Sequence, residues 1–221
     1  GLAALQQRWV LAFEERGEFL RLVWITIFVA VLLWSGIGPR DYPTWGLEVA
    51  PAVLGGIVLW FTRDRFPLTP LVYILILVHC IILMIGGHYT YAEVPLGEWA
   101  REAFDWSRNN YDKLGHFVQG FIPAMIAREV VIRLHVFNSD RWRDFFIVCF
   151  CLGLSAFYEL IEWWVALLSE EAADAFLGTQ GYAWDTQSDM GWALLGAMTA
   201  LLLLSRLHDR QLRERGYIAA V

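Results

Sequence analysis

Charged residues are scarce in this 221-residue sequence, and their scarcity excludes an ordinary soluble domain. Asp, Glu, Lys and Arg make up 18% of the residues, whereas 57% are apolar and the formal net charge is −6. Soluble domains carry about 25% charged residues. The acidic balance also argues against nucleic acid as a partner, because a surface that binds nucleic acid needs an excess of basic side chains.

Missing motifs exclude several enzyme classes. The sequence has no nucleotide-binding loop, no Gly-x-Ser-x-Gly elbow and no Cys-x-x-Cys pair. Its three cysteines, Cys80, Cys149 and Cys151, fall inside apolar stretches, where we expect them to pack as small core residues. Function therefore has to be sought in the polar residues that interrupt the apolar sequence.

Six long apolar segments predict an all-α, polytopic membrane protein with one transmembrane domain, a bundle of six helices. Most segments approach the roughly 20 residues that a spanning helix needs. The second is the weakest, because it is short and contains Glu48 and Pro51. The predicted spans cover about 20–37, 45–61, 68–85, 114–134, 145–168 and 190–207.

The distribution of basic residues predicts the orientation of this bundle. Thirteen of the 17 Lys and Arg residues lie in the two termini and in the second and fourth connections, and four lie in the other connections. Loops rich in Lys and Arg stay in the cytoplasm. We therefore expect a multi-pass protein of the bacterial inner membrane with both termini cytoplasmic.

Three pairs of polar residues stand at the helical spacings i,i+3 or i,i+4 near the predicted outer ends of spans. Each pair shares one helix face, and ionisable groups within a membrane mark functional sites. The orientation brings the three helix ends to the same side. We expect a cluster there, with five candidate metal ligands: Asp112, His116, Glu159, Glu162 and Asp189.

The chemistry of these side chains favours a divalent metal of open identity. Clustered carboxylates repel one another unless a cation is present, and Lys113 is the only basic residue close to them in sequence. Carboxylates mixed with imidazole suit zinc, manganese or iron. Glu162 or Asp189 is the expected catalytic base. Supporting residues are expected around the ligands: His88, Asp174, Gln180, Asp185 and Gln187.

Structural explanations compete with this site. Asp185, or a neighbouring hydroxyl residue, is a suitable cap for the sixth helix. His116 alone is compatible with a core histidine that donates to a carbonyl group. Glu129 and Arg133, four residues apart, are expected to form a surface ion pair of small consequence.

Four sequence runs resemble the YjdF family of bacterial inner-membrane proteins, which has no established activity. They are HYTYAEVPLGEW, RNNYDKLGHFVQGFIPAMIAREV, SAFYELIEWW and DAFLGTQGYAWDTQSDMGWALLGA. A more distant resemblance is to VanZ-like membrane proteins, linked to glycopeptide-antibiotic tolerance. It rests on Asp112, Lys113, His116, Glu162 and Asp189, but the Gln that VanZ-like proteins usually carry after the Glu is replaced here by Trp163, Trp164 and Val165.

Two outer loops are expected to contain further structure. Leu96, Trp99, Ala100 and Ala103 form one helical stripe, which predicts a helix lying in the membrane interface or, equally, a helix packed on the bundle. The loop after the fifth span is expected to return toward the cluster and bring Asp174 and Gln180 to it.

Three functions remain open at this point. The first is an outward-facing, cation-binding hydrolase or transferase that acts on lipid-linked envelope substrates. The second is a non-catalytic subunit or assembly factor, in which the cluster holds the helices together or receives a basic segment of a membrane protein partner. The third, an ion-coupled transporter with a Glu pair as proton relay, is weaker because the sequence has no visible internal repeat.

Overall fold

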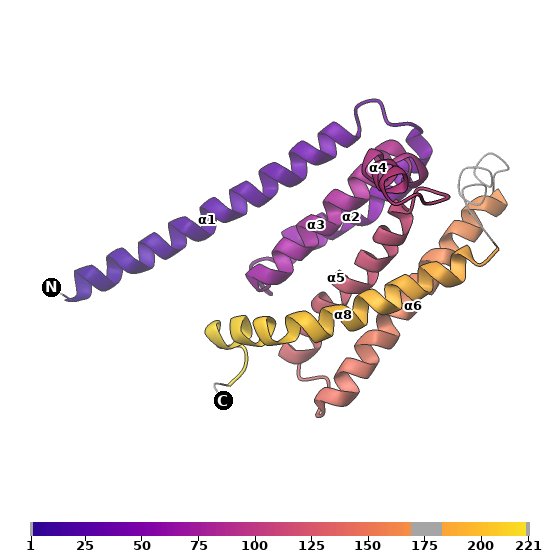
Figure 1. The fold of residues 1–221 in the computed structure, drawn as a ribbon. Helices are drawn as coiled ribbons and strands as arrows, with labels where there is room; N and C mark the ends of the chain where they lie inside the picture. Colours follow the sequence, from indigo (N-terminus) through magenta and orange to yellow (C-terminus); the bar gives the residue numbers. More distant parts are fainter. Residues whose placement is uncertain (1, 169–182, 220–221) are drawn as a thin grey trace.

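The chain folds into a bundle of long helices (Figure 1). The computed structural model describes residues 2–168 and 183–219, with side chains from residue 17 onward. The described residues contain no strand, which confirms the all-α prediction. The elements are α1 (Leu2–Ser35), α2 (Tyr42–Thr62), α3 (Pro70–Tyr89), η1 (Tyr91–Glu93), α4 (Pro95–Ala103), α5 (Tyr111–Arg133), α6 (Asp140–Leu168) and α8 (Asp185–Glu214).

Five of these helices are long and apolar enough to cross a membrane. Each predicted span lies largely within one helix, and the later helices extend beyond the predicted limits. The five candidates are Gly17–Ser35, Tyr42–Thr62, Pro70–Tyr89, Asp140–Leu168 and Asp185–Glu214. The remaining long helix, α5, carries polar and charged residues on its buried face, including His116, Arg128 and Glu129.

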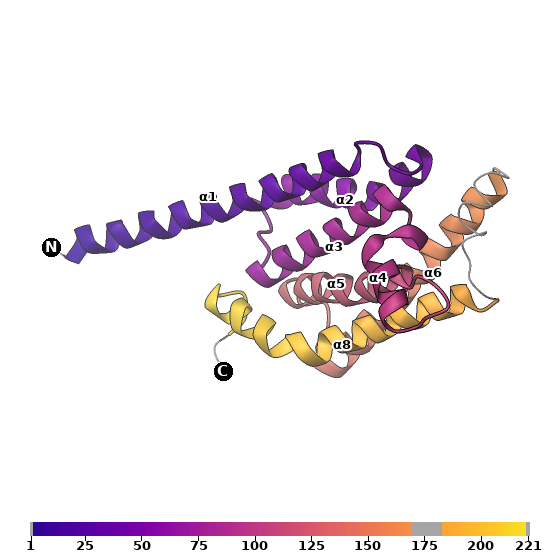
Figure 2. The ribbon, with the colours of Figure 1, turned by 45° about the horizontal axis from the view of Figure 1, so that its top comes forward.

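α5 occupies the middle of the bundle. It packs against α3, α6 and α8, while α2 packs along α3 (Figures 1 and 2). α1 also lies against α3, and the Trp24 indole N–H donates to the Tyr73 carbonyl at 2.8 Å. The closest approach joins α5 to α8: a Cβ atom at Gly120 would collide with the Ala193 carbonyl, and one at Gly196 with the Phe117 carbonyl.

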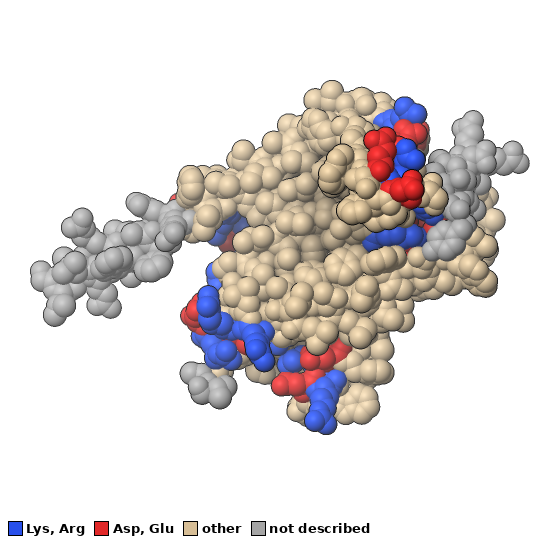
Figure 3. Space-filling model, in the orientation of Figure 1, with Lys and Arg blue, Asp and Glu red and all other residues tan. Residues whose placement is uncertain are grey.

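The surface of the bundle is apolar between two charged ends. Large hydrophobic side chains such as Phe61, Leu168 and Leu202 are exposed by 74%, 86% and 80%. Figure 3 shows Lys, Arg, Asp and Glu gathered near α4 at one end and near the end of α8 at the other. This distribution is the one that a bilayer requires, because hydrocarbon accepts apolar side chains and water accepts the charges.

α4 lies across the first of these ends, called here the α4 end. Gly97 is buried against Asn109, whereas Leu96 and Trp99 are exposed by 58% and 64%. The exposed Leu96 and Trp99 of the expected stripe therefore face away from the bundle, while α4 contacts the rest of the chain through Gly97.

A second polar network lies at the opposite end, where the sequence predicted only a surface ion pair. Glu129 and Arg133 do pair at 3.0 Å, but Glu129 is fully buried. Its carboxylate also accepts from the Thr69 backbone N–H and hydroxyl and from His208 Nε2. Because Thr69 precedes α3 and His208 belongs to α8, this carboxylate connects three helices, and the prediction of a surface pair was wrong.

Candidate functional site

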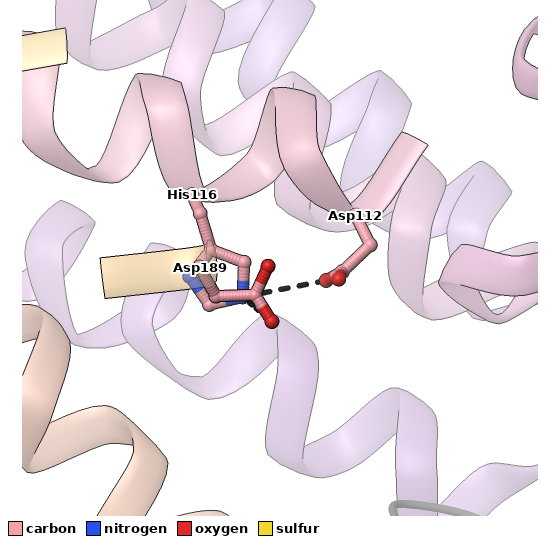
Figure 4. Close-up of side chains that lie close together, drawn as sticks. All are labelled: Asp112, His116 and Asp189. Carbon is pink, nitrogen blue, oxygen red and sulfur yellow. Dashed lines mark ion pairs between the residues drawn. The ribbon is translucent and has the colours of Figure 1, made fainter. Parts of the chain in front are cut away.

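Three helix ends meet around a cavity at the α4 end. The start of α5, the second half of α6 and the start of α8 supply five of its six carboxylates, and α2 and α3 complete the wall. The cavity has a volume of about 480 Å³. Figure 4 shows Asp112 and His116 of α5 and Asp189 of α8 pointing toward one another, with ligand atoms within 4.8 Å of each other.

His116 stands at the centre of this group. Its Nε2 atom lies 3.3 Å from Asp112 Oδ1, 3.8 Å from Glu159 Oε1 and 3.8 Å from Asp189 Oδ2. On the other side of the ring, Nδ1 lies 3.1 Å from Gln119 Oε1. A carbonyl oxygen accepts, so Nδ1 carries a hydrogen and Nε2 is the atom directed at the three carboxylates.

Glu159 contributes a carboxylate oxygen without a hydrogen-bond partner among the described residues. The residue is only 9% exposed, and its Oε1 atom is buried and unbonded. A buried polar atom in this state costs free energy, and a buried carboxylate costs more, unless a cation or proton lies beside it. This oxygen faces the same cavity as His116 Nε2.

Two basic residues neutralise the other side of the cluster. Lys113, the single lysine of the sequence, donates to Asp185 Oδ1 at 2.7 Å and to Asp189 Oδ1 at 2.5 Å. Arg108 Nη1 also donates to Asp185 Oδ1, at 2.9 Å. Asp185 is the first residue of α8 and makes no cap, since no side chain caps that helix. The expectation that Asp185 or a neighbour caps the helix was therefore wrong.

Comparison with known proteins assigns the family. Residues 20–210 match the family described as Predicted membrane protein (DUF2238). The chain belongs to this family. It is also 52% identical over 188 residues to the protein of Escherichia coli (strain K12) named Inner membrane protein YjdF, an alignment that covers 85% of this chain and 90% of that protein. No solved structure matches the chain.

Membership of DUF2238 agrees with the exposed apolar helices, and the chain is an integral membrane protein. It also supports the YjdF resemblance read from the sequence. The VanZ-like resemblance stays a prediction.

The predicted site residues of this DUF2238 chain fall into three groups. Glu162 and Asp185 line the cavity together with His116 and the three carboxylates around its Nε2 atom. His88 lies elsewhere, with Nδ1 3.0 Å from the Ser35 carbonyl oxygen and its ring against Trp34. Gln187 is on the exposed face of α8. The remaining two, Asp174 and Gln180, lie outside the described residues.

Several cavity residues were missed by the sequence reasoning. Glu48 of α2 is 7% exposed and accepts from the Tyr158 hydroxyl at 3.2 Å. It was identifiable, because the rule on ionisable groups inside spans applies to it as well. Tyr91 of η1 also lines the cavity, and burial raises the pKa of its phenol well above the ordinary value. No sequence signal distinguishes Tyr91 or Tyr158 from other aromatic residues of the chain.

Proposed function

We propose that this protein is a multi-pass protein of the bacterial inner membrane with six spans and both termini in the cytoplasm. The five apolar helices and the central α5 supply the six spans, and the basic residues supply the orientation. The name of the E. coli relative supports the location. In this orientation the α4 end faces outward, and Leu96 and Trp99 lie in the outer interface.

The cavity, in this proposal, binds one divalent transition-metal ion. The observation that carries it is the group of Asp112, His116 and Asp189, whose ligand atoms lie within 4.8 Å of one another. Glu159 Oε1 lies outside this group but 3.8 Å from His116 Nε2. Tetrahedral zinc with bonds of about 2.0 to 2.2 Å separates its ligand atoms by about 3.3 to 3.6 Å. A hydrogen on Nε2 points in one direction only, so imidazolium alone leaves Glu159 Oε1 unbonded. Gln119 would hold the ring in the tautomer that a metal needs.

The reaction best matched to this arrangement is hydrolysis or group transfer on a lipid-linked substrate at the outer face. A bound divalent ion lowers the pKa of a water ligand and polarises an ester or phosphoryl oxygen. Glu162 lines the cavity without belonging to the group of Asp112, His116 and Asp189, which suits a general base. Asp189 then serves as a ligand whose second oxygen is held by Lys113.

Metal analysis tests the proposal. Protein purified in detergent without chelator is expected to contain about one transition-metal ion per chain, and chelated protein to bind zinc or manganese again in a calorimetric titration. Glu159→Gln is expected to weaken that binding at least tenfold, whereas Glu93→Gln, at an exposed carboxylate, serves as control. Absence of stoichiometric metal together with no binding by the chelated protein overturns the proposal.

A non-catalytic subunit is the second candidate, and a different observation favours it. Lys113 already joins α5 to α8 through two aspartates, which is what a cluster with a purely structural role would do. This candidate predicts a metal-free protein that copurifies with a stable membrane partner. It also predicts that Glu159→Gln leaves metal content unchanged at zero.

A further inference from the structure

The cavity reaches the surface of the bundle between α2 and α6. α2 packs along α3, and α6 packs along α5 and α8, but α2 and α6 do not pack along each other. Both helices nevertheless line the cavity. Their apolar lining residues include Leu54 of α2, exposed by 61%, and Phe157 of α6, exposed by 51%. A side chain that both lines a cavity and is exposed marks a place where the cavity opens; exposed Ala92 of η1 marks another, at the α4 end.

This opening lies at the level of the hydrocarbon, because Leu54 and Phe157 both belong to candidate membrane spans. Its walls continue in apolar residues, with Pro51 on α2 and Leu154 and Ile161 on α6. The Tyr158 hydroxyl of α6 donates a hydrogen bond across this opening to Glu48 of α2. The molecule facing the opening in a membrane is therefore a lipid rather than water.

The charge of the cavity selects the head group. Six carboxylates line it, and the permanently charged bases that bond to them are Arg108 and Lys113. Among the ion pairs of the described residues, none joins Glu48 or Glu162 to a basic side chain, so these two carboxyl groups are the ones a further cation would meet. Glu159 Oε1, buried and unbonded, adds to the demand for a cation.

We infer that the opening between α2 and α6 admits a membrane lipid with a protonated amine in its head group, of the phosphatidylethanolamine type. The amine would lie between Glu48 and Glu162, and a hydrocarbon chain would lie against Leu54 and Phe157. A reaction on this lipid rests on the proposed function, because it requires the phosphate of the lipid to lie toward the proposed divalent ion. Recognition of the amine by Glu48 and Glu162 does not depend on that ion.

Site-specific photocrosslinking tests the inference. The protein carries p-benzoylphenylalanine in place of Phe157 or, as control, of Leu202, an exposed residue of α8 outside the cavity lining. It is placed in vesicles of equal amounts of phosphatidylethanolamine and phosphatidylglycerol, and the crosslinked lipids are identified by mass spectrometry. We expect phosphatidylethanolamine to be enriched several-fold at position 157 over position 202. Identical lipid composition at the two positions overturns the inference.

A substitution ties the enrichment to the head group. Glu48→Gln combined with Glu162→Gln is expected to reduce the enrichment at position 157 to the level at position 202. Enrichment that survives this change overturns the assignment of the amine to these carboxylates. Metal content measured on the same samples separates the two proposals: enrichment without metal refutes only the reaction, and metal without enrichment refutes only the lipid site.

Discussion

Lys113 Nζ lies 2.5 Å from Asp189 Oδ1, and the two residues are 76 positions apart in the sequence. The same amine also reaches Asp185, so the single lysine of the chain holds the start of α8 against the start of α5. Both partners are about nine-tenths buried. In this setting a charge pair matters less for the attraction it supplies than for the cost of leaving one partner alone.

Lys113→Met is therefore expected to destabilise the protein. It leaves Asp189 buried without its amine partner and Asp185 with Arg108, and a broken buried pair costs about 3 to 5 kcal/mol. Thermal unfolding in detergent measures the loss. Arg210→Met, which breaks an exposed pair with Glu214, should change the free energy of unfolding by at most about 0.5 kcal/mol. Equal effects of the two substitutions would contradict the account of the buried amine.

The sequence predicts the residues of one helix face well. Asp112 and His116 share a face because they are four residues apart, and so do Asp185 and Asp189. Helix topology and the distribution of basic residues predicted that the three helix ends with polar pairs lie on the same side of the bundle. The contacts between helices could not be predicted in this way, because they join residues far apart in the sequence. Arg108 and Asp185 are 77 positions apart, and Glu48 and Tyr158 are 110 positions apart.

Gln119→Leu tests the orientation of the imidazole. Loss of the acceptor for His116 Nδ1 frees the ring to rotate and to change tautomer, and removing such a supporting residue typically weakens metal binding about 10- to 100-fold. Competition with a chelating dye measures the affinity. Gln187→Leu is a matched control, since this glutamine is exposed on α8. Unchanged affinity in Gln119→Leu would remove Gln119 from the site.

Glu129→Ala tests the network at the opposite end. The carboxylate accepts from Thr69, His208 and Arg133, and its loss leaves those donors buried without their acceptor. We expect destabilisation of about 3 to 5 kcal/mol in thermal unfolding. Because this network is separate from the cavity, the metal content of the folded fraction should not change. Glu93→Ala, at an exposed ion pair with Arg40, is the control.

The prediction for Glu129 also shows why sequence reasoning failed there. A Glu and an Arg four residues apart on a helix are usually an exposed pair. The partners of buried Glu129 are Thr69, just before α3, and His208 of α8, which are 60 and 79 positions away in the sequence. His208 donates to Glu129 through Nε2 and accepts from Arg128 through Nδ1, so its ring connects the two charges.

The close approach of α5 and α8 can be tested with two glycines of the same helix. A Cβ atom at Gly196 would collide with the Phe117 carbonyl, which is rigid backbone, so Gly196→Ala must push the two helices apart. Gly191 lies five residues earlier on α8, and a Cβ atom added there would have no neighbouring atom within 4 Å. There, Ala replaces Gly in a helix interior without a collision and should stabilise by up to about 1 kcal/mol.

The two variants are expected to change stability in opposite directions. Gly196→Ala should lower the unfolding temperature and, because Lys113 and Asp189 lie on the separated helices, weaken metal binding as well. Gly191→Ala should raise the unfolding temperature and leave binding unchanged. Thermal unfolding and calorimetric titration of both proteins measure these effects. A stable Gly196→Ala protein with full metal affinity would mean that the contact between α5 and α8 does not position the cluster.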